Sequence, residues 1–369
     1  SQEDSTDYAW SVKEGAGTLT VTNEKIMGTI QVTKEIPDGL TASGSFTFDV
    51  KDSTGTTVDT LTMAAGESDT TIALPYGTYT IVETGTAAIT DYTWSGVTYK
   101  VNGAEAASFT IDEQGETIAV TAANAYTRDT GALEITKRIP AGDWSAVTGA
   151  ESYSGTISYS GAASGNVTFR KSDFGSAPVD GYYVKTWIIK DVPTGDYTIA
   201  ETGAGIDHYD LSKDIDEASV TVEKGETASV TVTNDYTIHT HDLSIEKIVA
   251  KTDTSVDAPE EDFTFTVKLG SGSVTVPDEQ YTGSSAPYVE NGSYTFTLSD
   301  EETAVITGVP YGVSYEVEET NIPEGFLSSW TDNKAAGTIG DAGNVTLTCT
   351  NTYFKSPVVS IQAEKDWSN

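Results

Sequence analysis

The chain has 369 residues and a formal net charge of −36, because 20 Lys and Arg stand against 56 Asp and Glu. An acidic balance of this size repels phosphate backbones, which excludes nucleic acid as a partner. No stretch approaches the roughly 18 consecutive apolar residues of a membrane-spanning helix, so membrane insertion of this segment is not expected. At roughly 100 to 200 residues per domain, the length indicates two to four domains.

Residue usage favours strands. The chain contains 34 Gly and only two Met, and Thr alternates with Val through much of the sequence. These features are typical of strands and turns, not of helices. A single cysteine, Cys349, excludes an internal disulfide framework and any multi-cysteine metal site. We therefore expect an all-β protein that holds neither a metal nor a cofactor.

Three sequence elements recur in fixed order along the chain. The first is a period-2 strand, GTIQVTK, that ends at Lys34. The second, LPYGTYTIVETG, is a Pro-Gly turn that feeds a strand with Tyr79 and, four residues later, Glu83. The third, TIAVTAANAY, is a strand that contains Asn124. The set occurs twice more, with Lys137, Glu201 and Asn234 and then with Lys247, Glu319 and Asn351.

This period near 100 residues predicts an array of similar domains. We expect complete domains at 25–127, 128–238 and 239–355. Residues 1–24 resemble the last strands of a truncated repeat, and 356–369 resemble the start of a further one. Each join between a closing Asn and the next Lys is only 13 or 14 residues long, which leaves little free linker. A monomeric rod of abutted domains is expected.

The alternation along each strand predicts that the motif side chains point inward. Residues two apart on a strand share a face, so Ile30 and Val32 share a face with Lys34. By the same count, Val120 lies on the face of Asn124. The count also holds for each Glu and for the other two repeats. Each domain is therefore expected to direct one Lys, one Glu and one Asn into its own core.

Such a buried set is chemically reactive. Burial in an apolar interior favours the uncharged amine of Lys and the protonated carboxylic acid of Glu. The amine can then attack the Asn side-chain carbonyl while the acid polarises that carbonyl and transfers protons, so that ammonia leaves. The product is a Lys–Asn isopeptide bond, formed once by the protein upon itself. An enzyme acting on an external substrate is not expected.

These three elements resemble the collagen-adhesin B-type (Cna-B) repeat domains of Gram-positive surface adhesins and pilins. The resemblance extends over essentially the whole chain and implies Ig-like β-sandwiches. It also implies that a first-strand Lys bonds to a last-strand Asn, with an acidic residue on a middle strand as catalyst. On this sequence, it implies the bonds Lys34–Asn124, Lys137–Asn234 and Lys247–Asn351, with Glu83, Glu201 and Glu319 as the catalytic residues.

The resemblance further implies an extracellular protein attached to the cell wall, whose anchor signal is not in this chain. The function it favours is a structural stalk segment, with any host protein or glycan bound by another part of the parent protein. Two alternatives stay open. One is a pilin subunit polymerised by sortase, and the other is a host-ligand-binding module. The aromatic residues Trp144, Tyr182, Tyr183 and Trp187 make the second domain the place to look for a binding surface.

Some assignments also stay open. In the third repeat, Gly312 precedes its Tyr by three residues instead of two, so we expect a bulge, and Glu318 competes with Glu319 as the catalyst. Asn23 and Lys365 belong to incomplete repeats and receive no bond.

Other residues that suggest chemistry have simpler readings. The alternating pair His239 and His241 lies in a join, and the acidic run at 207–216 has no EF-hand spacing. We interpret them as linker and solvated surface, not as metal sites. Cys349, two residues before Asn351, is interpreted as a small buried hydrophobic side chain and not as a nucleophile.

Overall fold

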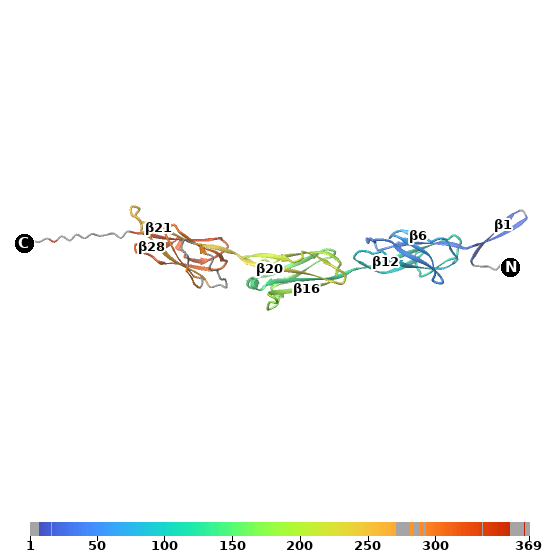
Figure 1. Ribbon diagram of the computed structural model, residues 1–369, viewed down its shortest axis with the longest axis horizontal. Coiled ribbons are helices and arrows are strands. Elements are labelled where there is room, and N and C mark those ends of the chain that lie inside the picture. Colours follow the sequence, from blue (N-terminus) through green and yellow to red (C-terminus); the bar gives the residue numbers. More distant parts are fainter. Residues whose placement is uncertain are drawn as a thin grey trace, which may run out of the picture.

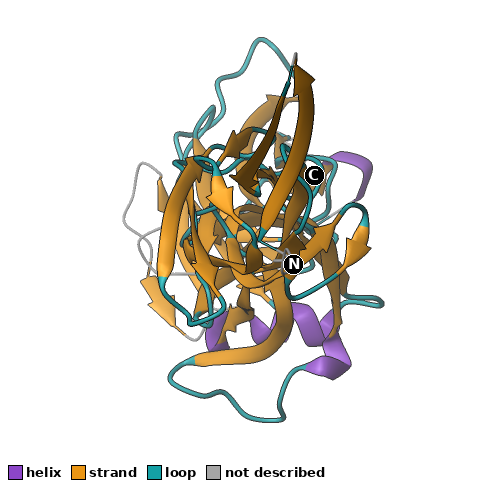
Figure 2. Cartoon of the chain, turned by 90° about the vertical axis from the view of Figure 1, so that its right-hand side faces the viewer, coloured by secondary structure: helices purple, strands orange, loops and turns teal. Residues whose placement is uncertain are grey.

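The computed structural model describes residues 7–15, 17–270, 281–282, 288–290, 293–333, 335–354 and 365. Within them, the chain forms three sandwiches arranged end to end in an elongated array (Figure 1). Figure 2 looks along the long axis and shows short helices at the edge of a body made mostly of strands. The expected start of a further repeat at 356–369 lies outside the described residues, apart from Lys365.

A two-stranded antiparallel hairpin precedes the first sandwich. Its strands are β1 (Tyr8–Gly15) and β2 (Thr18–Lys25). One face of this hairpin exposes apolar side chains, among them Trp10 and Val21. Asn23 lies on β2, opposite Trp10.

The first sandwich packs two sheets face to face. One sheet contains β3 (Met27–Glu35), β6 (Ser68–Thr70), β7 (Leu74–Pro75), β9 (Tyr92–Val101), β10 (Ala104–Glu105) and β12 (Thr117–Arg128). The other contains β4 (Phe46–Asp52), β5 (Thr57–Met63), β8 (Gly77–Gly85) and β11 (Phe109–Ile111).

The second sandwich has four strands in each sheet and three short helices. One sheet contains β16 (Tyr182–Pro193), β13 (Thr130–Pro140), β20 (Thr227–Ile238) and β18 (Tyr209–Ile215). The other contains β15 (Ser164–Arg170), β14 (Ser154–Ser160), β17 (Gly195–Gly203) and β19 (Ser219–Val222). The helices are η1 (Ala141–Asp143), α1 (Trp144–Gly149) and η2 (Lys171–Asp173).

The third sandwich repeats the plan. One sheet contains β23 (Tyr281–Thr282), β26 (Thr303–Pro310), β21 (Thr240–Lys251), β30 (Val345–Tyr353) and β28 (Phe326–Trp330). The other contains β24 (Tyr288–Glu290), β25 (Ser293–Leu298), β22 (Phe263–Leu269), β27 (Ser314–Asn321) and β29 (Ala336–Thr338), and η3 (Thr331–Asn333) follows β28.

Each sandwich has its own apolar core between its two sheets. The alternating Val, Ile and Phe of the strands supply these cores, as the period-2 pattern predicts. The expected all-β fold of tandem Ig-like sandwiches is therefore confirmed. None of the helices in the described part of the chain has the length and apolar character needed to cross a membrane.

In each sandwich, the first and last strands are neighbours and run parallel. These pairs are β3 with β12, β13 with β20, and β21 with β30. Parallel pairing places the entry of the chain into a domain and its exit at opposite ends of that domain. It is this arrangement that lets the domains follow one another along a line.

The joins between sandwiches are one residue long. Asp129 separates β12 from β13, and its N–H donates to the carbonyl of Asp91 at 2.9 Å while its own carbonyl accepts from the N–H of Thr194 at 3.0 Å. His239 makes the equivalent pair of bonds at the second join, with His208 and Tyr311, both at 2.8 Å. The backbone therefore ties each join to both of its domains.

Candidate functional site

The strand register brings the motif Lys and Asn of each domain to the same face of one sheet. Lys34 lies opposite Ala122, Lys137 opposite Val232 and Lys247 opposite Cys349. In all three pairs, the residue opposite the Lys stands two positions before the Asn. Residues two apart share a face, so each Asn side chain lies beside the Lys on the core side of the sheet.

The opposing sheet supplies the Glu. In the first domain, Glu83 Oε2 lies 3.5 Å from Lys34 Nζ, and Glu83 Oε1 accepts a 2.8 Å hydrogen bond from Asn124 Nδ2. In the second domain, Glu201 Oε1 lies 3.4 Å from Lys137 Nζ and accepts from Asn234 Nδ2 at 3.1 Å. Each carboxyl group therefore contacts both the amine and the amide.

The third domain has the same arrangement around Glu319. Its Oε1 lies 3.9 Å from Lys247 Nζ and accepts from Asn351 Nδ2 at 2.7 Å. The side chain of Glu319 is 2% exposed, whereas that of Glu318 is 62% exposed and pairs with Lys268 at the surface. The geometry thus brings Glu319, and not Glu318, to the Lys and the Asn.

The extra residue before Tyr315 does not produce the expected bulge between Gly312 and Tyr315. It lies in a turn at Tyr311–Gly312, ahead of β27, where Gly312 has a φ of +83°. Pairing between β22 and β27 stays regular until it shifts just after Glu319. The turn absorbs the additional residue because Gly tolerates the left-handed conformation, so the parity of the strand is preserved.

Burial sets the charge state of the amines. The side chains of Lys34 and Lys137 are fully buried, and desolvation lowers the pKa of each to about 8 although the neighbouring Glu opposes the shift. Desolvation also lowers the pKa of Lys247. Each amine is therefore closer to its neutral, nucleophilic form than a surface Lys.

The pH dependence of bond formation tests the role of the carboxyl group. The reactive form, a neutral Lys beside a protonated Glu, differs from the Lys–Glu ion pair only in which of the two groups carries the proton. The fraction of molecules in the reactive form therefore stays constant until the pair loses this proton, above about pH 8. We expect the rate of the first two bonds to be level from neutral pH up to about pH 8 and to fall about tenfold per pH unit above it.

This profile can be measured by refolding unlinked chain at each pH, quenching in denaturant and recording the intact mass. A rate that keeps rising above pH 8 would mean that the neutral amine alone suffices and that the acid proton has no part.

A phenylalanine ring lies beside each amine, and the sequence motifs did not identify it. Lys34 Nζ is 4.6 Å from the ring centroid of Phe46, and Lys247 Nζ is 4.1 Å from that of Phe263. In the second domain, the ring is that of Phe169, at 5.5 Å. These rings exclude water and interact favourably with the cationic form of the amine.

The second domain obtains its ring from a different strand. Gly155 occupies the strand position that corresponds to Phe46 and Phe263, two residues before the partner of the Glu. Phe169 on β15 lies opposite Gly155, and a Cβ on Gly155 would come within 2.3 Å of its ring. The repeated FTF segments at 46–48 and 263–265 are a sequence signal for the ring in the first and third domains. The second domain has no such segment, because its ring comes from a different strand.

The Tyr of each second element has a structural role in two of the domains. The hydroxyl of Tyr79 donates to the carbonyl of Pro75 at 2.6 Å, and that of Tyr197 donates to Pro193 at 2.8 Å. These bonds fasten the Pro-Gly turn to the strand that bears the Glu. The Tyr rings pack in the core, as expected for packing residues.

Cys349 is buried, and its thiol contacts polar groups of the third site. The Sγ atom lies 3.5 Å from Glu319 Oε2 and 3.4 Å from Ser328 Oγ. Burial raises the pKa of Cys349 to about 11, so the thiol stays protonated near neutral pH. This state agrees with a packing residue and not with a nucleophile.

The histidines of the second join contact acids and an aromatic ring. His208 stacks on Tyr311, with ring centroids 3.6 Å apart, and its Nδ1 lies 2.9 Å from Asp341 Oδ2. His239 Nε2 lies 3.3 Å from Asp210 Oδ1. Within the described ranges, no group of three or more His, Cys, Asp or Glu side chains could hold a metal ion.

The aromatic residues of the second domain pack against one another and against the core. Trp144 stacks on Tyr183 with ring centroids 4.1 Å apart, and Trp187 packs on the edge of the core cluster. Tyr182 lies under the guanidinium group of Arg138. All four rings are partly buried, so they do not form the exposed aromatic patch that would favour a binding module.

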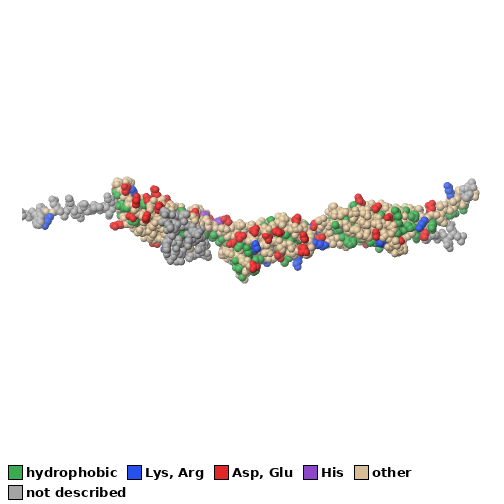
Figure 3. Space-filling model, in the orientation of Figure 1, with side chains coloured by type: hydrophobic (Ala, Val, Ile, Leu, Met, Phe, Trp, Pro, Cys, Tyr) green, Lys and Arg blue, Asp and Glu red, His purple; other side chains and the backbone are tan. Residues whose placement is uncertain are grey.

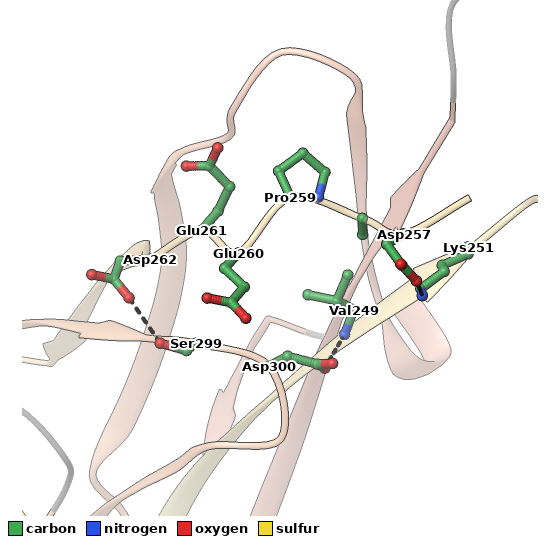
Figure 4. A pocket seen from close by; sticks show the side chains of 10 residues that line it. Val249, Lys251, Asp257, Pro259, Glu260, Glu261, Asp262, Ser299 and Asp300 are labelled. Carbon is green, nitrogen blue, oxygen red and sulfur yellow. Dashed lines mark hydrogen bonds and ion pairs between the residues drawn. The ribbon is translucent and has the colours of Figure 1, made fainter.

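An acidic cavity of about 800 Å³ opens beside β21 in the third domain (Figure 4). Several of its acids already have partners. Asp257 pairs with Lys251 at 3.1 Å, Asp300 accepts from the N–H of Val249, and Asp262 accepts from the Ser299 hydroxyl. No residue of the three Lys–Glu–Asn sets lines this cavity.

Comparison with solved structures gives distant similarities. Two B repeats of the collagen-binding protein of Staphylococcus aureus share 16% identity, with 95% of this chain and 81% of that chain covered and a TM-score of 0.34. The TIE protein of Bacillus anthracis shares 17% identity over 91% of this chain, with a TM-score of 0.33. This chain spans 53% of the length of that protein.

A third similar structure is the major pilin T-13 of Streptococcus pyogenes. It shares 17% identity, with 60% of this chain and 97% of the pilin covered, at a TM-score of 0.31. No curated protein matches the sequence. The B repeats of S. aureus are the type of domain that the sequence motifs indicated.

Family models match all three sandwiches. The model described as "Domain of unknown function (DUF7601)" matches residues 241–353. The model described as "Domain of unknown function (DUF5979)" matches twice, at residues 30–127 and 133–237, and so accounts for more than half of the chain. The chain therefore belongs to the DUF5979 family.

Proposed function

We propose that this chain is a structural stalk segment of a Gram-positive cell-surface adhesin or pilus-type protein, stabilised by an autocatalytic Lys–Asn isopeptide bond in each of three domains. The observation that supports it is the threefold occurrence of a buried Glu side chain that contacts both a buried Lys and a buried Asn. The proposed folding units are 25–127, 128–238 and 239–355. The proposed location is extracellular and attached to the cell wall.

The proposed reaction exchanges one amide for another. The neutral Lys Nζ attacks the Asn Cγ, the new Nζ–Cγ bond forms, and the Cγ–Nδ2 bond breaks. The Glu carboxyl group, which contacts Nδ2 in the structure, polarises the Asn carbonyl once the amide turns to present Oδ1 to it. It then carries the proton lost by Nζ to the departing Nδ2, which leaves as ammonia. Folding supplies the driving proximity, because the three groups come from strands far apart in the sequence.

Burial of unpartnered polar atoms supports this chemistry. In the first domain, Asn124 Oδ1 is buried without a hydrogen-bond partner, and in the second domain the same holds for Asn234 Oδ1. A buried polar atom without a hydrogen-bond partner destabilises the fold, so residues that serve only to pack the core are not expected to contain one. We interpret these two oxygens as the carbonyl groups that accept a hydrogen bond from the protonated Glu during the reaction.

The position of the proposed bonds suits a protein under tension. Each bond would join the first strand of a domain to its last strand, so that force entering at one end leaves at the other through covalent bonds. The joins then carry the load between domains. At the first join, Arg128 pairs with Asp91 at 3.2 Å and Lys224 pairs with Asp129 at 3.1 Å, in addition to the backbone bonds.

The charge of the chain suits a rod held away from an anionic wall. Asp and Glu side chains are spread along the visible face of the array, with few Lys and Arg among them (Figure 3). Like charges along the rod oppose both compaction and adsorption to a surface of the same sign.

The intact mass of the purified chain tests the proposal. Each bond releases one ammonia, so we expect a mass about 51 Da below that of the sequence, which is about 17 Da for each of three bonds. Digestion should then yield branched peptides that join each Lys to its Asn. A chain with the full sequence mass after folding would refute the self-crosslinked stalk.

A further inference from the structure

The three sites differ in the groups that contact the carboxyl oxygens of the Glu. In the first domain, Glu83 Oε2 faces Lys34 Nζ at 3.5 Å. In the second domain, Glu201 Oε2 is buried without a hydrogen-bond partner. In the third domain, Glu319 Oε2 accepts a hydrogen bond from the hydroxyl of Ser328 and lies 3.5 Å from the thiol of Cys349. The first site also has a hydroxyl donor, but Thr86 donates to the other oxygen, Glu83 Oε1, at 3.3 Å. Of the three sites, only the third gives Oε2 a hydroxyl donor.

The donor comes from a strand position that is equivalent in all three domains. Ser328 on β28 lies directly opposite Asn351 on β30. The residue opposite Asn124 is Val97, and the residue opposite Asn234 is Lys213, whose Nζ donates to the backbone carbonyl of Glu201. The residue at this position therefore lies opposite the reacting Asn in every domain, and it is Val, Lys or Ser in the first, second or third domain.

We infer that Ser328 is a positioning residue for the isopeptide bond of the third domain, an inference that rests on the proposed function. The final torsion of a Glu side chain has a broad, roughly two-fold energy profile, so the two carboxyl oxygens exchange places easily. The Ser328 hydroxyl holds Oε2 and thereby keeps Oε1 directed at Asn351 Nδ2, 2.7 Å away, and toward Lys247 Nζ.

The third site needs such a restraint more than the first. Its amine lies 3.9 Å from Oε1, against 3.5 Å and 3.4 Å for the closest Lys–Glu contacts of the other two domains. Lys247 Nζ also makes the shortest bond to a backbone carbonyl, 3.1 Å to Ile248, against 3.3 Å from Lys34 to Ala122 and 3.4 Å from Lys137 to Val232. With a weaker hold from the amine, the orientation of the carboxyl group depends on Ser328. Cys349 Sγ, a weak donor, supplements that bond.

The experiment uses the isosteric pair Ser328→Thr and Ser328→Val, which differ only in the hydroxyl. Full-length chain is recovered unfolded and unlinked and is refolded. Samples are quenched over time, and each bond is followed by its own branched peptide. We expect Ser328→Val to slow the third bond by about tenfold, the loss of one charge-assisted hydrogen bond, and Ser328→Thr to stay within about twofold of the wild type.

The same samples contain their own controls. The first and second bonds should form at unchanged rates in every variant, and Ser329→Val, at an exposed neighbouring hydroxyl, should leave all three bonds unaffected. Ser328→Ala removes the hydroxyl without adding volume, and we expect it to match Ser328→Val. Resistance of the third domain to proteolysis verifies that it has folded.

Two results would overturn the inference while leaving the proposed function intact. Ser328→Val and Ser328→Thr rates that are both as fast as wild type would mean that the hydroxyl has no role. If both are equally slow, the added volume is responsible, and Ser328→Ala decides. A Ser328→Ala variant as fast as wild type would likewise mean that the hydroxyl has no role. If the wild-type chain forms no third bond at all, the proposed function fails for this domain, and the role of Ser328 fails with it.

Discussion

A Glu319→Gln variant is expected to lack the third Lys–Asn bond, whereas the neighbouring Glu318→Gln variant should form all three. Gln keeps the length of the side chain and can still contact Asn351, but it cannot give or take a proton at neutral pH. General acid–base catalysis typically contributes about a hundredfold or more to a rate, so the third bond should be undetectable on the timescale of the other two.

The two variants are a matched pair because the same change falls on adjacent residues of one strand. The Glu319 side chain is buried against Lys247 and Asn351, and that of Glu318 faces solvent. The intact mass should lie about 34 Da below the sequence mass for Glu319→Gln and about 51 Da below it for Glu318→Gln. The reverse outcome would assign catalysis to Glu318 and would require a different register for β27.

The motif residues could be located from the sequence because their positions depend on strand alternation. Lys34 follows two apolar residues at period 2, and this pattern alone directs it to the core, where it is fully buried. The parity of Glu319 could be taken from Tyr315 in the same way. Whether the buried groups react is a separate question, and it stays a proposal.

Contacts between distant strands could not be predicted. Phe169 replaces the ring that Phe46 supplies in the first domain, but it does so from a neighbouring strand opposite Gly155. Ser328 lies in the segment FLSSW, which has no counterpart among the repeated elements. Both residues are identified only by the register between strands, which the alternation of a single strand does not contain.

The joins show the same limit in another form. Their short length could be counted from Asn124 to Lys137, and it favours abutted domains. The backbone bonds that fix Asp129 and His239 to both neighbouring domains involve residues about 30 to 70 positions away. The side chains that contact each other at the first join differ from those at the second, so no repeated sequence pattern identifies these contacts.

Replacement of Asn234 by alanine is expected to convert the second domain from inextensible to extensible under force. The variant keeps the Lys137–Glu201 ion pair but removes the carbonyl that the amine attacks. Once this domain unfolds, the segment from 137 to 234 is released, which at about 3.4 Å per residue adds about 330 Å of chain. The wild-type chain should show no step of this size, because the proposed bond joins residues 137 and 234 directly and the segment between them carries no tension.

Single-molecule stretching of the full chain measures this length directly, and Asn166→Ala is the matched control. Asn166 lies on β15 within the same segment, but its side chain is exposed, so its loss should leave the domain inextensible. In solution, the lost crosslink should lower the free energy of unfolding of the second domain by about 5 kcal/mol, if the loop-entropy model for disulfides applies. An extension of about 330 Å in wild type and variant alike would mean that no covalent bond spans the domain, and tension would then pass through the hydrogen bonds between β13 and β20 alone.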